Sequence, residues 1–193
     1  MSNIVKVSEK IENFKKSITV PGDKSLSIRW VLFASLANGT SKAKNLLMSE
    51  DVLAAINAIK KLGIKVLINK KECTIYGKGI NGYKYRKKLT INAQNSGTLG
   101  RLILGLLVNT PYPISLVGDK SLSKRDFRRV SDPLSKFGAK FKLTKNNFLP
   151  LKIFGSSKLQ SIKYYENKAS AQCKSSIILA GMRSNGTTRI LRG

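Results

Sequence analysis

Apolar runs alternate with short polar segments along the chain, and the same order of segments returns three times. Each copy begins with an extended stretch and small polar residues, continues into an apolar helix and an asparagine-containing turn, and ends in a strand-like run. The copies read VPGDKSLSIRWVLFASLANGTSKAKNL, INAQNSGTLGRLILGLLVNTPYPISLV and YENKASAQCKSSIILAGMRSNGTTRIL. Such self-similarity predicts a domain built from repeated units.

The first two copies also share their second halves. Residues 49–68 and 123–143 each predict an amphipathic helix followed by a strand, with the helices ending at Gly63 and Gly138. Glycine just past a helix and lysine in its last turn are common C-terminal signals, and Ser49 is the expected N-cap of the first helix. A further strand-like run follows each, so the unit reads β-α-β-α-β-β. The predicted fold class is α/β.

The units are expected at 20–80, 88–156 and 162–193, and together they form one domain, 20–193. The third unit holds only its first half. Because a missing half leaves apolar surface and a sheet edge uncovered, we expect the chain to be a fragment of a longer protein. A degenerate last repeat is the alternative.

Charge points to anionic partners. The chain has 36 Lys and Arg against 10 Asp and Glu, a formal net charge of +26. This balance favours nucleic acid, acidic lipid, or phosphorylated and carboxylated metabolites. A coding bias toward Lys, Ile and Asn is the competing explanation.

Several classes of chemistry are excluded or disfavoured. The sequence has no histidine, which removes Ser-His and Cys-His pairs and histidine metal sites. Cys73 and Cys173 match no zinc or redox spacing. No apolar run approaches the roughly 20 residues that cross a bilayer, and no secretory signal is recognisable. We expect a cytoplasmic protein that uses no metal and no membrane.

The polar segment before each apolar helix is a candidate anion site. Free N–H groups at a helix N-terminus favour an anion, and small side chains let it approach the backbone. These segments contain Lys24 and Ser25 in unit one, Ser96–Thr98 in unit two, and Ser170–Gln172 in unit three. If the units pack around a pseudo-threefold axis, the segments converge on one cradle. Capping and turn formation are the alternative roles.

Two arginines follow these segments. Arg29 lies one turn past Ser25, where it could clamp a carboxylate or remain a solvated charge. Arg101, four residues after Gly97, is interpreted as a structural brace for its loop.

Four motifs resemble the 5-enolpyruvylshikimate-3-phosphate synthase (3-phosphoshikimate 1-carboxyvinyltransferase) family. They are PGDKSLSIR, NSGTLGR, GDKSLSKRDFRRVSDPL and ASAQCKSSIILAG, in the family's order and across nearly the whole chain. The resemblance implies an inside-out α/β barrel-type domain. It also implies enolpyruvyl transfer from phosphoenolpyruvate to the 5-hydroxyl of shikimate 3-phosphate, in aromatic amino acid and chorismate biosynthesis, without a cofactor.

The resemblance assigns roles residue by residue. Lys24 is expected to contact both substrates. The other expected contacts to shikimate 3-phosphate come from Ser25, Arg29, Ser170, Ala171 and Gln172. Gly97, Arg125 and Gln172 are expected to contact phosphoenolpyruvate. Because Gly97 lacks the methyl group of an alanine, the intact enzyme is expected to be sensitive to glyphosate, which resembles that substrate.

Two departures from the family pattern matter. Asp126 stands where the family usually has proline, and its charge could weaken anion binding at Arg125 or point outward. No segment matches the family's acid–base carboxylates, which lie in its C-terminal half. The chain is therefore expected to be inactive alone and to need a C-terminal domain, which residues 1–19 would join.

Two other functions stay open. A UDP-sugar enolpyruvyl transferase shares the architecture but is expected to have Lys-Asn where this chain has Lys24-Ser25. A basic nucleic-acid-binding module related to RNA-end cyclases would use lysine-rich segments such as YKYRKKL (83–89) as a phosphate track, although a solvated loop explains that segment too. Under the favoured interpretation no nucleic-acid partner is expected.

Overall fold

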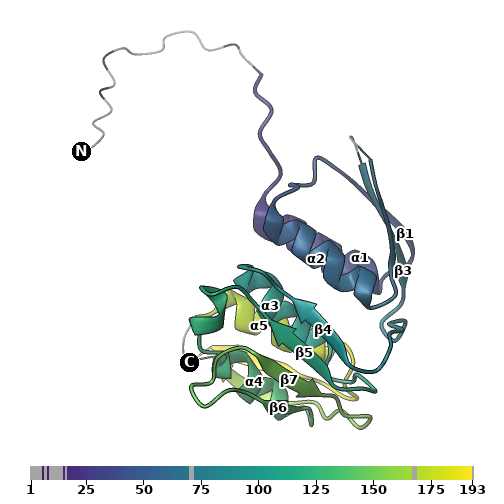
Figure 1. Ribbon diagram of the computed structural model, residues 1–193, viewed down its shortest axis with the longest axis vertical. Helices are drawn as coiled ribbons and strands as arrows, with labels where there is room; N and C mark the ends of the chain where they lie inside the picture. Colours follow the sequence, from purple (N-terminus) through teal and green to yellow (C-terminus); the bar gives the residue numbers. More distant parts are fainter. Residues whose placement is uncertain are drawn as a thin grey trace.

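The computed structural model describes residues 6, 8, 15, 17–69, 72–166 and 169–192. Most of the N-terminal segment 1–19 lies outside the described residues, and so does its expected role in joining another domain. The rest forms three successive α/β units, with the first in the upper part of Figure 1 and the other two below it.

The first unit is an α-β-α-β-β segment. Its elements are α1 (Lys24–Leu36), β1 (Asn38–Lys44), α2 (Glu50–Lys61), β2 (Lys65–Ile68) and β3 (Glu72–Lys78). The strands form an antiparallel sheet in the order β1-β3-β2.

The opening strand expected for this unit is not formed, since residues 17–23 contain no strand. Pro21 has no N–H to donate to a neighbouring strand, which weakens ladder formation there. The side-chain amide of Asn45 instead donates to the Val20 carbonyl at 3.1 Å and ties this segment to the end of β1.

The second unit has the full β-α-β-α-β-β order that the sequence predicts. It comprises β4 (Leu89–Asn92), α3 (Gly97–Leu106), β5 (Ile114–Val117), a 3-10 turn (Leu122–Lys124), α4 (Arg128–Ser135), β6 (Lys140–Lys142) and β7 (Leu151–Phe154). The sheet order is β4-β5-β7-β6, with β4 and β5 parallel and the other neighbours antiparallel.

The third unit holds β8 (Lys163–Glu166), α5 (Ala171–Gly181) and β9 (Arg189–Arg192), and its two strands are parallel. This is the first half of the unit, as predicted. No helix in the described part of the chain is long and apolar enough to cross a membrane.

Both predicted glycine stops are confirmed. Gly63 and Gly138 have φ of +87° and +109°, the left-handed region that glycine enters without strain, just past α2 and α4. Ser49 does occupy the N-cap position of α2. Its hydroxyl, however, makes no capping hydrogen bond, so the expected side-chain cap is not formed.

The core is centred on the first helix of each unit. In α3 every residue except Arg101 is buried, and α3 packs against both α1 and α5. Gly105 allows a close approach, because a β-carbon there would lie 2.2 Å from the Ser176 carbonyl oxygen of α5. The Ser176 hydroxyl donates to the Arg101 carbonyl at 2.9 Å, which adds a polar contact to this packed interface.

Candidate anion-binding site

The N-termini of α1, α3 and α5 are built alike. The capping residues are Asp23, Ser96 and Ser170, and the side chain of each accepts a backbone N–H three residues later. The donor–acceptor distances are 2.7, 3.2 and 3.3 Å. Capping is therefore part of the role of these segments, as the alternative interpretation held. It leaves other N–H groups of each first turn available to an anion.

The second and third units meet at the N-terminus of α3. The Arg101 guanidinium donates to Gln172 Oε1 at 2.8 Å and to the Gly97 carbonyl at 3.3 Å. The other end of the Gln172 amide donates to Thr98 Oγ1 at 3.1 Å. These hydrogen bonds fix the orientation of the Gln172 side chain beside the first turn of α3.

Two guanidinium groups lie over Gly97. A β-carbon at that position would be 2.8 Å from Nη1 of Arg101 and 3.0 Å from Nη1 of Arg125. Burial lowers the pKa of the Arg101 guanidinium, and the charges of Arg125 and Arg129 lower it further. This accumulation of positive charge at the α3 N-terminus is suited to an anionic ligand. We call Gly97, Thr98, Arg101, Arg125 and Gln172 the Gly97 cluster.

The corresponding end of the first unit has different partners. Lys24 Nζ lies 3.1 Å from Asp51 Oδ2, at the first turn of α2. Arg29 donates to the Ser25 carbonyl at 3.3 Å on its own helix. Among the described residues, no hydrogen bond or ion pair joins Lys24, Ser25 or Arg29 to the Gly97 cluster.

The structure thus brings together part of the predicted set. Gly97, Arg125 and Gln172 come from three separate motifs and meet at one point, with Ser170 and Ala171 just before Gln172 in the chain. Arg101 braces the loop through Gly97, as expected, and also holds Gln172, which the sequence did not reveal.

Asp126 does not neutralise Arg125. Its carboxylate accepts from the backbone N–H of Arg128 at 2.7 Å and from the Arg128 guanidinium at 2.8 and 3.1 Å. These hydrogen bonds hold the pKa of Asp126 below its ordinary value. Of the two outcomes considered for Asp126, the charge is directed away from Arg125 toward Arg128.

Sequence reasoning missed two charged neighbours of the site. The pairing of Asp51 with Lys24 depends on how α1 and α2 pack, which no local pattern encodes. The charge of Arg129, at the start of α4, contributes to lowering the pKa of Arg101. The adjacent arginines Arg128 and Arg129 were the only sequence feature that could have indicated this charge.

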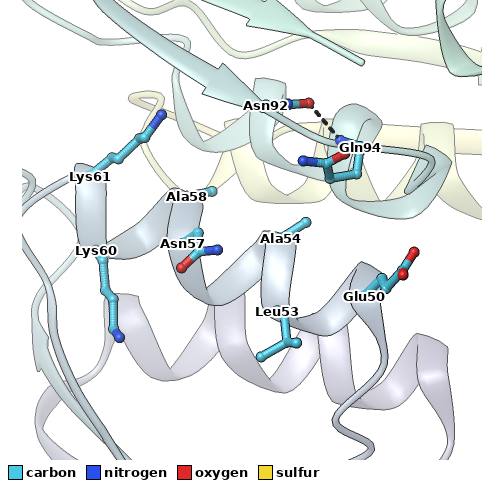
Figure 2. Close-up of a pocket in the computed structure, with 9 residues that line it drawn as sticks. All are labelled: Glu50, Leu53, Ala54, Asn57, Ala58, Lys60, Lys61, Asn92 and Gln94. Atoms are coloured by element: carbon cyan, nitrogen blue, oxygen red, sulfur yellow. Dashed lines mark hydrogen bonds between the residues drawn. The ribbon is translucent and has the colours of Figure 1, made fainter. Parts of the chain in front are cut away.

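A large cavity does not coincide with the Gly97 cluster. It has a volume of about 670 Å³ and lies between α2 and the end of β4, where Figure 2 shows Glu50 at one end of α2, Lys60 and Lys61 at the other, and Asn92 and Gln94 above it. A second cavity of about 400 Å³ includes Ser170 in its lining. The candidate site is therefore identified by the guanidinium groups that meet at Gly97, and not by the volume of a cavity.

Comparison with known proteins identifies the family. The family model for EPSP synthase (3-phosphoshikimate 1-carboxyvinyltransferase) matches residues 8–192. This chain belongs to the EPSP synthase family. The family assignment is consistent with a basic cluster assembled from motifs that lie far apart in the sequence.

Relatives within the EPSP synthase family support the assignment. The chain is 42% identical over 174 residues to the 3-phosphoshikimate 1-carboxyvinyltransferase of Leuconostoc mesenteroides, and 40% identical over 183 residues to that of Bacillus subtilis. These alignments cover 90% and 94% of the chain and 40% and 42% of the relatives. The chain spans about two fifths of the length of these relatives.

The fold agrees with a solved member of the family. The EPSP synthase of Acinetobacter baumannii superposes with a TM-score of 0.85 at 38% sequence identity. The superposition covers 90% of this chain and 39% of that one. The predicted α/β fold of the enolpyruvyl transferase type is therefore confirmed.

Proposed function

We propose that this chain supplies the N-terminal substrate-binding domain of an enzyme that transfers the enolpyruvyl group of phosphoenolpyruvate to the 5-hydroxyl of shikimate 3-phosphate. The observation that carries the proposal is the family match over residues 8–192. The Gly97 cluster supports it, because both substrates are polyanions and the cluster concentrates cationic and N–H donors.

The reaction is an addition followed by an elimination. The 5-hydroxyl loses its proton as its oxygen bonds to C2 of phosphoenolpyruvate and C3 accepts a proton, which gives a tetrahedral intermediate. Loss of phosphate from C2 and of a proton from C3 then restores the enol double bond. The domain's task in both steps is to bind and orient two anions and to exclude water when the cleft closes.

The residue roles follow the family motifs. Arg125 and the backbone at Gly97 hold phosphoenolpyruvate, and Lys24 contacts both substrates. Gln172 lies between the two ligands in a fixed orientation, since its amide is held by Arg101 and Thr98. Shikimate 3-phosphate is held by Ser25, Arg29, Ser170, Ala171 and Gln172.

Lys24 has to serve both Asp51 and the substrates in this scheme. An ammonium group has three N–H donors, and the ion pair with Asp51 at 3.1 Å can use one of them. The pair thereby orients Lys24 and leaves donors for an anion.

The proposed enzyme is a cytoplasmic one that needs a C-terminal domain as partner. That domain supplies the acid–base carboxylates and further cationic ligands, and it closes the cleft. A UDP-sugar acceptor is disfavoured because Ser25 follows Lys24 in place of the asparagine expected for that class.

Calorimetric titration of the chain with shikimate 3-phosphate tests the proposal. Binding is expected, and it should weaken in Arg29→Gln, which removes the cation assigned to the substrate carboxylate. Shikimate, which lacks the phosphate, is the control ligand and should bind more weakly. Equal binding of the two ligands, or none of the phosphorylated one, would refute the assigned substrate.

A further inference from the structure

Among the described residues, the strands of the sheet β4-β5-β7-β6 carry lysines and no carboxylates. The sequence contains no aspartate or glutamate between Glu72 and Asp119, or between Asp132 and Glu166. These two stretches supply all four strands of the sheet. The four strands therefore contribute only positive formal charges to this face.

Strand register gathers polar side chains into one row. Thr90 of β4 pairs with Ser115 of β5, Ser115 with Lys152 of β7, and Lys152 with Lys142 of β6. The neighbouring row contains Ile114 and Ile153, which are fully buried, so the pleat directs the first row outward. Neighbouring strands lie about 4.8 Å apart, so this row of two hydroxyls and two ammonium groups spans roughly 14 Å.

A cavity of about 360 Å³ extends the row toward the start of β4. Two more lysines and a tyrosine contribute to its lining, which comprises Lys87, Lys88, Thr90, Tyr112, Pro113, Ser115 and Lys152. Lys87 belongs to the lysine-rich segment YKYRKKL, which the proposed enzyme function leaves unused.

Aromatic rings restrain two of these lysines. Lys87 Nζ lies 5.2 Å from the centre of the Tyr112 ring, and Lys152 Nζ lies 5.7 Å from that of Phe154. Cation–π contacts at this range reduce the freedom of the ammonium groups and so lower the entropy lost on binding an anion. The Tyr112 and Phe154 side chains remain 38% and 36% exposed, so their rings are also accessible to a stacking partner.

The first sheet differs from this face because a carboxylate lies beside its lysines. Its outer surface carries lysines as well, but Lys42 there lies 3.5 Å from Glu72. Lysine is abundant on both sheets, whereas the carboxylate-free row occurs on the sheet β4-β5-β7-β6. Replacing three lysines of the first sheet therefore removes the same number of charges from a different face and serves as the control.

We propose that this outer face binds the phosphate backbone of single-stranded nucleic acid. Single strands expose both phosphates and base faces, and the row offers cations beside two accessible rings. A duplex hides its base faces and is read by elements that enter a groove, which a flat sheet face does not do. This role goes beyond the proposed enzyme function and departs from the expectation of no nucleic-acid partner. It shares no residue with the Gly97 cluster.

The test compares two triple variants by fluorescence anisotropy with a short labelled oligouridylate. Lys87→Gln, Lys142→Gln and Lys152→Gln alter the proposed face, while Lys42→Gln, Lys44→Gln and Lys65→Gln alter the first sheet. Both sets lower the net charge of +26 by the same amount. We expect the first set to weaken binding about tenfold and to reduce the slope of log affinity against log salt by about 2, with less than about twofold loss for the second.

Equal losses in the two variants would overturn the proposal, because they would show that net charge alone drives binding. No binding at low salt, or tighter binding of a duplex of the same length, would also overturn it. Saturating shikimate 3-phosphate is expected to leave oligonucleotide binding unchanged, and displacement would contradict a separate site. None of these results would refute calorimetric binding of shikimate 3-phosphate, so the two proposals can fail separately.

Discussion

Gly97 keeps space open beneath two guanidinium groups. Alanine there would place a methyl group 2.8 Å from Arg101 Nη1 and 3.0 Å from Arg125 Nη1, so both side chains would have to shift. We expect Gly97→Ala to weaken phosphoenolpyruvate binding at saturating shikimate 3-phosphate by about tenfold, roughly 1.4 kcal/mol. Calorimetric titration measures the change.

Gly100 is the matched control on the same helix. A methyl group there would lie 3.4 Å from the Phe127 ring and 3.6 Å from Ala93, which are ordinary contacts. Gly100→Ala is therefore expected to leave anion binding unchanged, and an equal loss in both variants would refute the role of Gly97. The predicted glyphosate sensitivity of the intact enzyme depends on the same absent methyl group.

Arg125 and Arg128 differ in whether a carboxylate of the chain already pairs with their charge. Arg128 donates three side-chain hydrogen bonds to Asp126, whereas the Arg125 guanidinium lies next to Gly97. Arg125→Gln is expected to weaken phosphoenolpyruvate binding about tenfold or more, because it removes a cation from the cluster. Arg128→Gln removes the same charge three residues away and should change binding by less than about twofold. Comparable losses in calorimetry would indicate a general charge effect instead.

At the candidate site, the sequence predicted only those residues that belong to a recognisable motif. Gly97, Arg125 and Gln172 were predicted from short patterns, and they meet as expected. The link from Arg101 to Gln172 spans 71 positions in sequence and depends on how closely α3 and α5 pack, which no local pattern encodes. The Asp126–Arg128 pair is local, but the sequence did not decide whether the Asp126 charge would act on Arg125 or point outward.

At the scale of elements, side-chain contacts connect the C-terminal ends of the first helices, at the opposite end from the candidate anion-binding site. Arg183, just past α5, donates to Asn109, just past α3, and its guanidinium lies 5.4 Å from the centre of the Tyr83 ring. The Tyr83 hydroxyl in turn lies 2.8 Å from the Ser35 hydroxyl of α1. A cation is favoured at helix C-termini, so this arrangement joins three units where their dipoles are negative.

Tyr83→Phe tests this connection through pH. Burial raises the pKa of Tyr83, while the hydrogen bond with Ser35 and the charge of Arg183 lower it by less. A raised folded-state pKa favours the neutral phenol in the folded protein. That stabilisation is fully present below the unfolded pKa of about 10 and is lost as pH rises through the folded value.

We therefore expect Tyr83→Phe to lower the free energy of unfolding by about 1 kcal/mol near neutral pH. The difference from the parent chain should shrink above about pH 10. Urea unfolding at several pH values measures it. Tyr76→Phe, on the outer face of the first sheet, is the control and should show neither effect. A pH-independent difference would contradict a buried, neutral Tyr83.

Element order was the most predictable level of the fold. Apolar helices with glycine stops at Gly63 and Gly138 are local signals, and both were located correctly. The prediction of an opening strand in the first unit was wrong. A strand needs a hydrogen-bonding partner as well as an extended sequence, and Pro21 has no backbone N–H to donate. The full second unit and the half third unit followed from the repeat alone.

At the scale of the whole molecule, apolar surface remains on the first helices. Leu26 and Phe33 of α1 are 67% and 45% exposed, and Ile178 of α5 is 52% exposed. In the second unit, α3 is instead enclosed by α1 and α5. The described part of the chain therefore encloses the first helix of unit two more fully than those of units one and three. Lys24 and Arg29 of unit one correspondingly contact residues outside the Gly97 cluster.

Binding and turnover should therefore separate in this chain. Enolpyruvyl transfer moves protons at two steps, and the sequence has no histidine for that task. Carboxylates are the remaining candidates, yet three that lie at or near helix N-termini are already engaged. Asp23 caps α1, Asp51 pairs with Lys24, and Asp126 pairs with Arg128.

We expect the chain to bind shikimate 3-phosphate and to release no phosphate from phosphoenolpyruvate above the uncatalysed rate. A continuous phosphate-release assay at saturating substrates measures this, with the full-length Bacillus subtilis relative as positive control. A carboxylate already committed to an ion pair or a helix cap is poorly placed to take and return a proton at a reacting carbon, since either transfer breaks the contact that holds it. Phosphate release that scales with chain concentration and disappears in Arg125→Gln would contradict this division, and it would place the proton-transfer groups among the residues of the chain itself.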